Sequence, residues 1–465
     1  MANIFSKLND WWSGKTMLDG NLLNRTLYQM IGGQAAHYDA DAKTYLEQGF
    51  GNNPDVFAII MQQADKTKAV PYAVKKIEDK ANFRKLQELR TATKWDFSVQ
   101  QMARAKVLES KAFASNEVKF PLEQPNPNQT WGEIFALYKI FLKVTGNVYF
   151  YTVSPKEGAN VGVPKQLYLL PSHLVKIVLK PDANVLEDEN PIDYYMLIEG
   201  DQYIKFQTED VFHVKTPNPF YDFSGSHLYG LSPIKAGLRN LQSSNSALDH
   251  NVKTMENSGI YGFLTSADAD KPFTADQALQ MKDKLREMDN ASGRLSRIAG
   301  SSVPIAFTKL SLNTDELKQF DFLKYDQKVL CNILGWSDKL LNSDTALTYD
   351  NLQNERKRVI TDNIQPDLAL LAEAFNKYFI PKFKGYENCL IEWDITELPE
   401  MQEDYKLMVE WMQQAPLTPN EIRTALKYET MDIEGMDVPW IEQGRKRIDE
   451  VSVTETDITK SYEML

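Results

Sequence analysis

The chain has 465 residues and a formal net charge of −12, and 43% of its residues are hydrophobic. This length and apolar content predict a globular protein of two to four domains and exclude a disordered chain. Two cysteines and five histidines without zinc-type spacing give no support for a disulfide framework or a zinc site, and no apolar run is long enough to predict secretion or a membrane span.

The net negative charge is concentrated at the C-terminal end. Residues 386–465 carry nineteen acidic and seven basic side chains, so the preceding residues are close to neutral overall. Proteins that hold DNA tightly usually show a basic stripe, because Lys and Arg release counterions from the phosphates. The charge distribution therefore argues against tight DNA binding. It is compatible with a solvated acidic tail, and also with a surface along which a polyanion can slide.

The first half of the chain predicts a mixture of helices and strands. Residues 55–68, 70–77 and 80–93 read as helix, strand and helix, and a proline-rich linker follows at 121–128. Thr130 and Glu133 form a capping-box pattern that opens an apolar helix ending at Gly146. Alternating patterns predict strands of a mixed or antiparallel sheet at 147–153, 165–170, 174–179, 193–198, 202–206 and 210–215.

A long out-and-back excursion follows. Pro233 opens a helix rich in Ser, Asn and Gln. Its narrow apolar seam consists of Ile234, Leu238, Leu241, Leu248, Val252 and Met255. Strands at 260–265, 295–298 and 305–308 and a helix at 274–288 predict a small α/β unit, after which a return helix runs from Asn313 or Thr314 to Gly335. We expect the seam to be under-buried in one chain and to be covered by identical copies around a closed axis.

The polar stretch 337–350 predicts a loop, and a helix at 350–379 follows it, with a kink expected at Pro366. A strand is predicted at 389–395, and the acidic remainder reads as helices with a break at 416–419. The run Arg356-Lys357-Arg358 is the most basic spot that could meet a phosphate. A solvated helix face is the other interpretation of that run.

Motifs for catalysis are weak. Ser13-Gly14-Lys15-Thr16 imitates the end of a phosphate-binding loop, but Asn9 stands where the first glycine belongs and no strand precedes it. Acidic clusters such as 187–189 and 403–404 could hold Mg²⁺ for a nuclease, although adjacent acids are more often solvated. We therefore expect no enzyme activity, no cofactor and no metal site, with a metal-dependent nuclease as the alternative.

Six motifs occur in a fixed order along the chain. They are Asn126-Pro127-Asn128 before a helix that ends in Thr145-Gly146-Asn147-Val148-Tyr149; the strands at 167–179; Asp210-Val211-Phe212-His213-Val214; Tyr229-Gly230-Leu231-Ser232-Pro233-Ile234; Ile333-Leu334-Gly335-Trp336-Ser337 with Leu340-Leu341; and Leu417-Thr418-Pro419-Asn420-Glu421-Ile422-Arg423. Together they resemble the portal proteins of tailed bacteriophages, in particular the family typical of long-tailed phages. The resemblance runs from about Asn53 to Tyr428, and Trp336-Ser337 departs from the usual Val-Pro.

The resemblance implies an α+β fold with portal architecture. Its parts would be an N-terminal extension (1–50), an α/β wing (51–230), a first stem helix (231–258), a small α/β clip (259–312), a second stem helix (313–336), a tunnel loop (337–350), a long kinked helix with a wing strand (351–400) and an acidic helical crown (401–465). In this family the tunnel loop projects into a central channel. The resemblance places Ser343, Asp344, Thr345, Ala346, Leu347 and Thr348 at the constriction, with Arg356 and Lys357 nearest to DNA phosphates.

The resemblance also implies the partners and the place of action. It predicts a homo-oligomeric ring, usually of twelve subunits, at a unique capsid vertex of the virion, assembled in the host cytoplasm. Double-stranded DNA would pass through the ring during packaging and ejection. The implied protein partners are the large subunit of the packaging terminase, the major capsid protein and a head-tail adaptor, with no membrane involved. A phage nuclease or another virion enzyme that uses the acidic clusters remains the alternative.

Overall fold

The computed structural model of the protein describes most of the chain. The described residues are 41–92, 99–114, 118–180, 190–199, 202–221, 225–256, 262–266, 274, 276, 279, 280, 283, 305–309, 319–341, 349–415, 417–426, 428–433, 435–441 and 446–447. The chain divides into two compact units, one made of Met1–Leu238 with Leu330–Leu465 and the other of Arg239–Val329. Each unit is described separately below.

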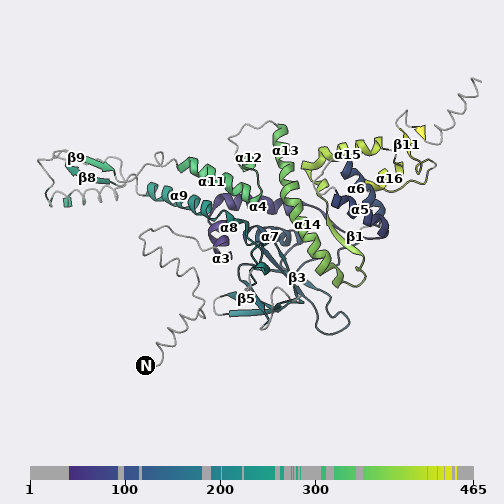
Figure 1. Cartoon of the computed structure of the whole chain (residues 1–465), viewed down its shortest axis with the longest axis horizontal. Coiled ribbons are helices and arrows are strands. Elements are labelled where there is room, and N and C mark those ends of the chain that lie inside the picture. Colours follow the sequence, from purple (N-terminus) through teal and green to yellow (C-terminus); the bar gives the residue numbers. More distant parts are fainter. Residues whose placement is uncertain are drawn as a thin grey trace, which may run out of the picture. The chain divides into compact units, whose positions relative to one another are not determined.

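Helices and strands alternate in the first unit as the sequence pattern predicts, and the α+β class is confirmed (Figure 1). The elements up to residue 238 are α3 (Ala42–Thr44), η1 (Tyr45–Gly51), α4 (Pro54–Ala69), β1 (Tyr72–Lys76), α5 (Lys80–Ala92), α6 (Val99–Ala112), α7 (Trp131–Val144), β2 (Asn147–Val153), β3 (Gln166–Leu170), β4 (Val175–Leu179), β5 (Ile192–Glu199), β6 (Gln202–Gln207), β7 (Val211–Lys215), η2 (Ser226–Leu228), α8 (Pro233–Ala236) and the first residue of α9 (Leu238–Glu256).

The C-terminal part of the same unit begins inside α11 (Gln319–Leu334). It continues with α12 (Asp338–Leu341), α13 (Tyr349–Val359), η4 (Ile360–Ile364), α14 (Gln365–Ala374), η5 (Phe375–Phe379), η6 (Ile380–Lys382), β10 (Cys389–Trp393), η7 (Ile395–Glu397), η8 (Pro399–Met401), α15 (Gln402–Gln414), α16 (Pro419–Ala425), β11 (Trp440–Ile441) and β12 (Lys446–Arg447). The helix break expected at 416–419 lies between α15 and α16.

The described strands of the first unit pair in antiparallel fashion. Strand β2 is the centre of one three-stranded sheet in the order β3-β2-β7, and β5 is the centre of another in the order β4-β5-β6. Strand β10 returns from the C-terminal half to pair with β1, with Tyr72 opposite Trp393 and Lys76 opposite Cys389. The sequence predicted either a mixed or an antiparallel sheet, and the observed strand pairing is antiparallel.

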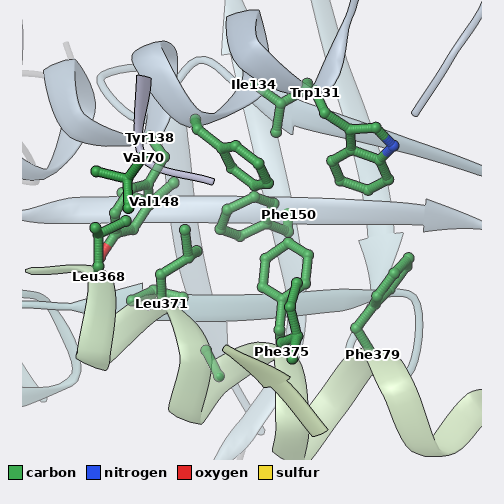
Figure 2. Close-up of a cluster of buried hydrophobic side chains, with 14 of the residues drawn as sticks. Val70, Trp131, Ile134, Tyr138, Val148, Phe150, Leu368, Leu371, Phe375 and Phe379 are labelled. Atoms are coloured by element: carbon green, nitrogen blue, oxygen red, sulfur yellow. The ribbon is translucent and has the colours of Figure 1, made fainter. Parts of the chain in front are cut away.

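The main core joins α7 and β2, which are neighbours in the sequence, to the long helix (α14 and η5) more than two hundred residues later. Figure 2 shows Trp131 and Ile134 of α7 on one side, Leu368, Leu371, Phe375 and Phe379 of the long helix on the other, and Val148 and Phe150 of β2 between them. Phe150 stacks on Phe212 of β7 with 4.7 Å between ring centroids and meets Phe375 edge to face at 5.4 Å. Burying such large rings contributes about 1.5–3 kcal/mol each, so this cluster holds the first unit together.

Three features of the first unit differ from the sequence-based expectations. Helix α6 was not predicted, and it is held by tertiary ion pairs such as Lys106 to Asp394 at 2.5 Å. The predicted stem helix is interrupted, since α8 ends at Gly237 and α9 starts at Leu238, as the low helix propensity of glycine favours. Part of the stretch expected to be a loop is also the short helix α12.

Two of the family-like motifs meet where α8 begins. The Gly230 N–H donates to Asn147 Oδ1 at 2.6 Å, and Ser232 Oγ donates to the Val144 carbonyl oxygen at 2.6 Å. A Cβ on Gly230 would collide with the Gly146 carbonyl oxygen, and one on Gly146 would lie 2.6 Å from the Leu231 carbonyl oxygen. Only glycines allow this close backbone approach, so the junction fixes where the helix begins.

His213 belongs to the same junction and is structural. Its Nε2 lies 3.0 Å from Asn147 Oδ1, and its ring stacks on Tyr149 with 4.2 Å between centroids. Burial, together with nearby Lys215, lowers the pKa of His213 to about 3. The ring is therefore neutral at ordinary pH and donates its Nε2 proton to Asn147.

The second unit contains most of α9, the first part of α11, and the antiparallel pair β8 (Gly262–Ser266) and β9 (Ile305–Lys309). Asn240 Nδ2 donates to Asp326 Oδ1 at 2.7 Å, and Asp326, Ser244 and Asn245 are buried. Part of the Ser/Asn surface of α9 is therefore used inside this unit. The strand predicted at 295–298 lies outside the described residues, as does most of the helix predicted at 274–288.

The expected apolar seam is only partly uncovered. Ile234 and Leu241 are buried within the chain, Leu238 and Leu248 are half-buried, and Val252 is 54% exposed; the Met255 side chain lies outside the described part. The expectation that the whole seam needs a neighbouring copy is thus wrong for Ile234 and Leu241. The large uncovered side chains are instead Phe320, Phe322 and Tyr325 of α11, which are 59%, 59% and 62% exposed.

We predict that Gly230→Ala destabilises the first unit by about 3 kcal/mol, because the added methyl group forces the Gly146 and Gly230 backbones apart. Thermal unfolding should shift downward by roughly 6–12 °C. Gly132→Ala is the matched control, since a Cβ there meets nothing closer than 4.0 Å inside α7. Equal melting temperatures for the two variants would contradict the close-approach explanation.

Candidate functional site

The sequence places the functional loop between the end of α11 and the start of α13. Ser343, Asp344, Thr345, Ala346, Leu347 and Thr348 lie outside the described residues, so their expected place in a channel remains a prediction. The described flanks are the turn at Gly335, helix α12 and helix α13. These flanks show how the chain holds the two ends of that segment.

One amide side chain joins both flanks. Asn363, in the π-helical turn η4 after α13, donates from Nδ2 to the carbonyl oxygens of Leu334 at 2.7 Å and Gly335 at 2.9 Å. Gln63 Nε2 donates to the same Leu334 oxygen at 3.0 Å. Gly335 has a φ of 71°, and a Cβ there would collide with the Asn363 amide. The last carbonyls of α11 are thereby satisfied.

A buried lysine anchors Asn363 in turn. Lys139 of α7 is fully buried, and its Nζ donates to Asn363 Oδ1 at 2.5 Å, to the Asn363 carbonyl oxygen at 3.3 Å and to the Asp367 carboxylate. Lys143 reaches Asp367 at 2.9 Å. We call Lys139, Asn363 and Asp367, with the Leu334 and Gly335 carbonyls, the Asn363 clamp.

Lys139 meets the backbone at a π-helical turn. The turn η4 directly precedes α14, which has Pro366 in its first turn, and proline has no N–H to donate. Lys139 Nζ donates to the Asn363 carbonyl oxygen of this turn at 3.3 Å. The kink expected at Pro366 therefore takes the form of a π-helical turn at Ile360–Ile364, and a second such turn follows at Phe375–Phe379.

The ionisation of the clamp follows from its burial. Burial and the neighbouring Lys143 charge lower the pKa of Lys139 to about 7, although Asp367 opposes this effect. Burial alone would raise the pKa of Asp367, but Lys139 and Lys143 outweigh burial and lower it. Because Lys143 also neutralises Asp367, Lys139 is the group that can lose its proton near neutral pH.

The three basic residues of α13, Arg356, Lys357 and Arg358, differ in exposure and in ion pairing. Arg356 is exposed and makes no hydrogen bond or ion pair with another described residue, whereas Arg358 pairs with Asp362 at 3.3 Å. Lys357 is half-buried. Glu355 accepts from Lys339 of α12 at 2.8 Å, which lowers its pKa. Arg356 is thus an exposed cation without an ion pair among the described residues, and its charge acts electrostatically on Glu400.

A pocket of about 520 Å³ lies beside Arg356. Its apolar lining consists of Leu340, Leu341, Leu352, Val359 and Ile360. Its other lining residues are Gln62, Lys66, Trp336, Lys339, Arg356 and Glu400. Trp336 is 8% exposed, and its Nε1 has no hydrogen-bond partner among the described residues. We call this cavity the Trp336 pocket.

Sequence reasoning missed the clamp and the pocket. Lys139 left a detectable signal, because it is a cation within the apolar face of α7, next to Tyr138 and Leu142. Asn363 and Trp336 left none, since an amide in a helix and a tryptophan after a helix have many possible roles. Among the described residues no group of three His, Cys, Asp or Glu side chains could hold a metal ion. The acidic cluster at 187–189 and the side chains at 403–404, on which the nuclease alternative depends, lie outside the described part of the chain.

Comparison with known proteins gives concordant matches. The sequence matches the phage portal protein family over residues 89–426. An uncharacterized protein of Rickettsia felis (strain ATCC VR-1525 / URRWXCal2) is 22% identical over 311 residues, covering 64% of this chain and 76% of that protein. Among solved structures, the neck of an empty gene transfer agent particle, computed with C6 symmetry, is 18% identical, with a TM-score of 0.57 over 86% of this chain and 96% of that one.

A second solved structure, the virion of a native gene transfer agent particle, is 17% identical, with a TM-score of 0.55 over 86% of this chain and 98% of that one. These likenesses show that the chain shares its fold with chains of gene transfer agent particles. Since the family match spans well over half of the residues, the chain belongs to the phage portal protein family, as the ordered motifs predicted. None of the described helices is both long and apolar enough to cross a membrane.

We predict that Lys139→Met lowers the free energy of unfolding by about 2–3 kcal/mol, because the Asn363 acceptors lose their buried donor. The pKa of Lys139 is lower in the folded protein than its usual value of 10.5. The unfolded chain therefore binds more protons above pH 7, and the wild-type advantage should grow as pH rises from about 7 toward 10.

Chemical denaturation of wild type and variant at several pH values measures this difference. Lys143→Met is the matched control, since Lys143 contacts only the Asp367 carboxylate of the clamp and keeps some solvent exposure. An advantage that stays constant between pH 7 and 10 would show that Lys139 stays charged in the folded protein.

Proposed function

We propose that copies of this chain form a closed ring, the portal of a phage-like head, through which double-stranded DNA is packaged and ejected. Membership of the portal family over residues 89–426 carries this proposal. The similar solved structures come from particle necks, one computed with C6 and another with C12 symmetry. We expect twelve subunits at one capsid vertex of a virion assembled in the host cytoplasm.

The proposed parts follow the order of the chain. Helices α9 and α11 would be the two stem helices, with β8 and β9 in the clip between them. The unit that contains β1 to β7 and β10 would be the wing, and α15 and α16 would begin the crown. The clip would receive the large terminase subunit and later a head-tail adaptor, while the wing would face the major capsid protein.

A ring gives the exposed aromatic side chains a function. Phe320, Phe322 and Tyr325 project from α11 into solvent in the single chain. Large exposed apolar side chains mark contact surfaces, and one repeated heterologous contact that closes on itself covers them in every copy. The inter-subunit stem contact would therefore involve α11 more than the seam of α9.

The described side chains of α9 are better suited to letting DNA slide past than to binding it tightly. The exposed described residues of α9 are Arg239, Ser243, Ser246, Asp249 and Val252, so its described surface offers DNA one arginine beside one carboxylate. Affinity for DNA depends on how many phosphates are neutralised, and a nearly neutral wall allows the duplex to slide. The energy for packaging would come from the terminase, and the ring itself would catalyse no reaction. Arg356 is the described cation that we expect to meet phosphate.

The direct test of ring formation is electron microscopy of the purified protein. We expect annular particles with a central hole, and sedimentation should show a large homo-oligomer. A stable compact monomer at high concentration would contradict the proposal. Tyr325→Arg should reduce annular particles at least severalfold, because it places charge in the proposed contact, whereas Val161→Arg in an exposed loop should leave them unchanged.

The channel role is tested by replacing Ser343–Thr348 with a Gly-Ser segment of equal length. We expect rings to form normally while packaging or retention of DNA falls, because the side chains that meet the duplex have been removed. The matched control replaces the exposed residues 157–162 in the same way. Unchanged DNA content in particles that carry the first replacement would disprove the assignment of this loop.

A further inference from the structure

The Trp336 pocket combines an apolar lining with a charged rim. Leu340, Leu341, Leu352, Val359 and Ile360 supply the apolar lining. Glu400 accepts from Lys66, and Arg356 is exposed beside the cavity. An apolar cavity that is left unfilled marks a contact surface, so this arrangement suits a ligand that carries apolar side chains.

The chemistry of the pocket points to a polypeptide segment. An apolar side chain could fill the space lined by Leu341, Leu352 and Val359. A nearby carboxylate would pair with Arg356, which makes no ion pair with a described residue. The pocket therefore fits an exposed segment that carries apolar and acidic side chains.

The chain itself presents such a segment at residues 428–433, which we call the hook segment. Its sequence is Tyr-Glu-Thr-Met-Asp-Ile, and every residue in it is exposed. Tyr428, Met431 and Ile433 are 63%, 41% and 61% exposed. The carboxylates of Glu429 and Asp432 make no ion pair with a described residue. Three large apolar side chains thus alternate with two free acids.

The hook segment is held in a defined shape. Buried Asn420 donates from Nδ2 to the Met431 carbonyl oxygen at 3.0 Å and accepts from the Met431 N–H at 3.0 Å. Arg423 Nε donates to the Glu429 carbonyl oxygen at 2.8 Å, and its guanidinium lies over the Tyr428 ring at 5.8 Å. A pre-ordered segment loses little conformational entropy on docking, so exposed apolar residues on such a segment indicate a contact site.

We propose that the hook segment of one copy docks into the Trp336 pocket of a second copy of this chain. Both surfaces belong to the same compact unit, and there the hook side chains stay exposed while the pocket stays open. The contact is therefore not made within one copy. Ile433 enters the apolar part of the pocket and Asp432 pairs with Arg356. Two different surfaces make the contact heterologous, which suits a closed ring, and to that extent the inference rests on the proposed function.

Covalent trapping tests the contact in the full-length protein. The double variant Leu341→Cys with Ile433→Cys is oxidised with copper-phenanthroline, and products are separated on a non-reducing gel. Cys331 and Cys389 are buried, so the wild-type chain sets a low background. We expect a reducible ladder of multimers, because each copy carries one cysteine of each surface. Leu341→Cys with Val161→Cys is the matched control and should give no ladder.

Other outcomes overturn the docking inference. Rings seen by electron microscopy without a ladder would leave the proposed function standing and exclude this contact. A cross-link within one chain, which shifts the band without raising the mass, would show that a segment of the same copy fills the pocket. Absence of both rings and a ladder would remove the ring proposal and this inference together.

Charge exchange supplies a second measurement that needs no cysteine. Arg356→Glu and Asp432→Arg should each raise the protein concentration for half-assembly about tenfold without DNA, and the double variant should return within about threefold of wild type. Arg358→Glu is the control for a charge change on the same helix, since Arg358 pairs with Asp362 and does not line the pocket. Failure of the double variant to recover would exclude the Arg356–Asp432 pair.

Discussion

The Asn363 clamp is the constraint on which the functional region depends. Lys139 is buried beneath the main core, and it can stay there only because Asn363 and Asp367 supply oxygen acceptors. Asn363 uses its remaining donor group to hold the end of α11. One buried lysine thereby holds the end of α11 against the π-helical turn η4 that follows α13. Moving either helix would leave polar groups buried without partners, which is costly.

The aromatic core explains why the clamp can be rigid. Phe150, Phe212, Phe375 and Phe379 pack between β2, β7 and the long helix, so that the π-helical turn is seated against a close-packed surface. Close-packed interiors resist small displacements. The backbone junction of Gly146 with Gly230 does the same at the start of α8. The first unit thus offers fixed points both to the chain that leaves toward α9 and to the chain that returns through α11.

Membership of the portal family sets the context for these fixed points. A protein whose function is to surround a moving polymer needs a frame that does not deform and walls that do not bind strongly. The buried ion pair and the glycine contacts are features of the frame, while the sparse charge on α9 suits the proposed wall. Trp336 stands where the resembled motif has valine. Its buried indole N–H has no hydrogen-bond partner among the described residues.

Local patterns in the sequence determined much of the fold. The capping box at Thr130, the alternation in β2 to β7 and the stop at Gly335 depend on neighbouring residues, and all were found in the structure or lie at its element ends. The ordered motifs determined the family. Helix α6 escaped prediction because its ends carry no strong signal and its ion pairs join residues far away in the chain.

Only the tertiary structure decided the interactions that depend on long-range contacts. Whether Ile234 and Leu241 are covered, which oxygen atoms Lys139 meets and whether Arg356 has a partner all depend on residues more than a hundred positions away or on which side chains leave a cavity unfilled. Periodicity reports the face of a helix and not what packs on it. The sequence therefore determined the elements and the family, while packing decided the clamp and the pocket, because burial is a property of the assembled chain.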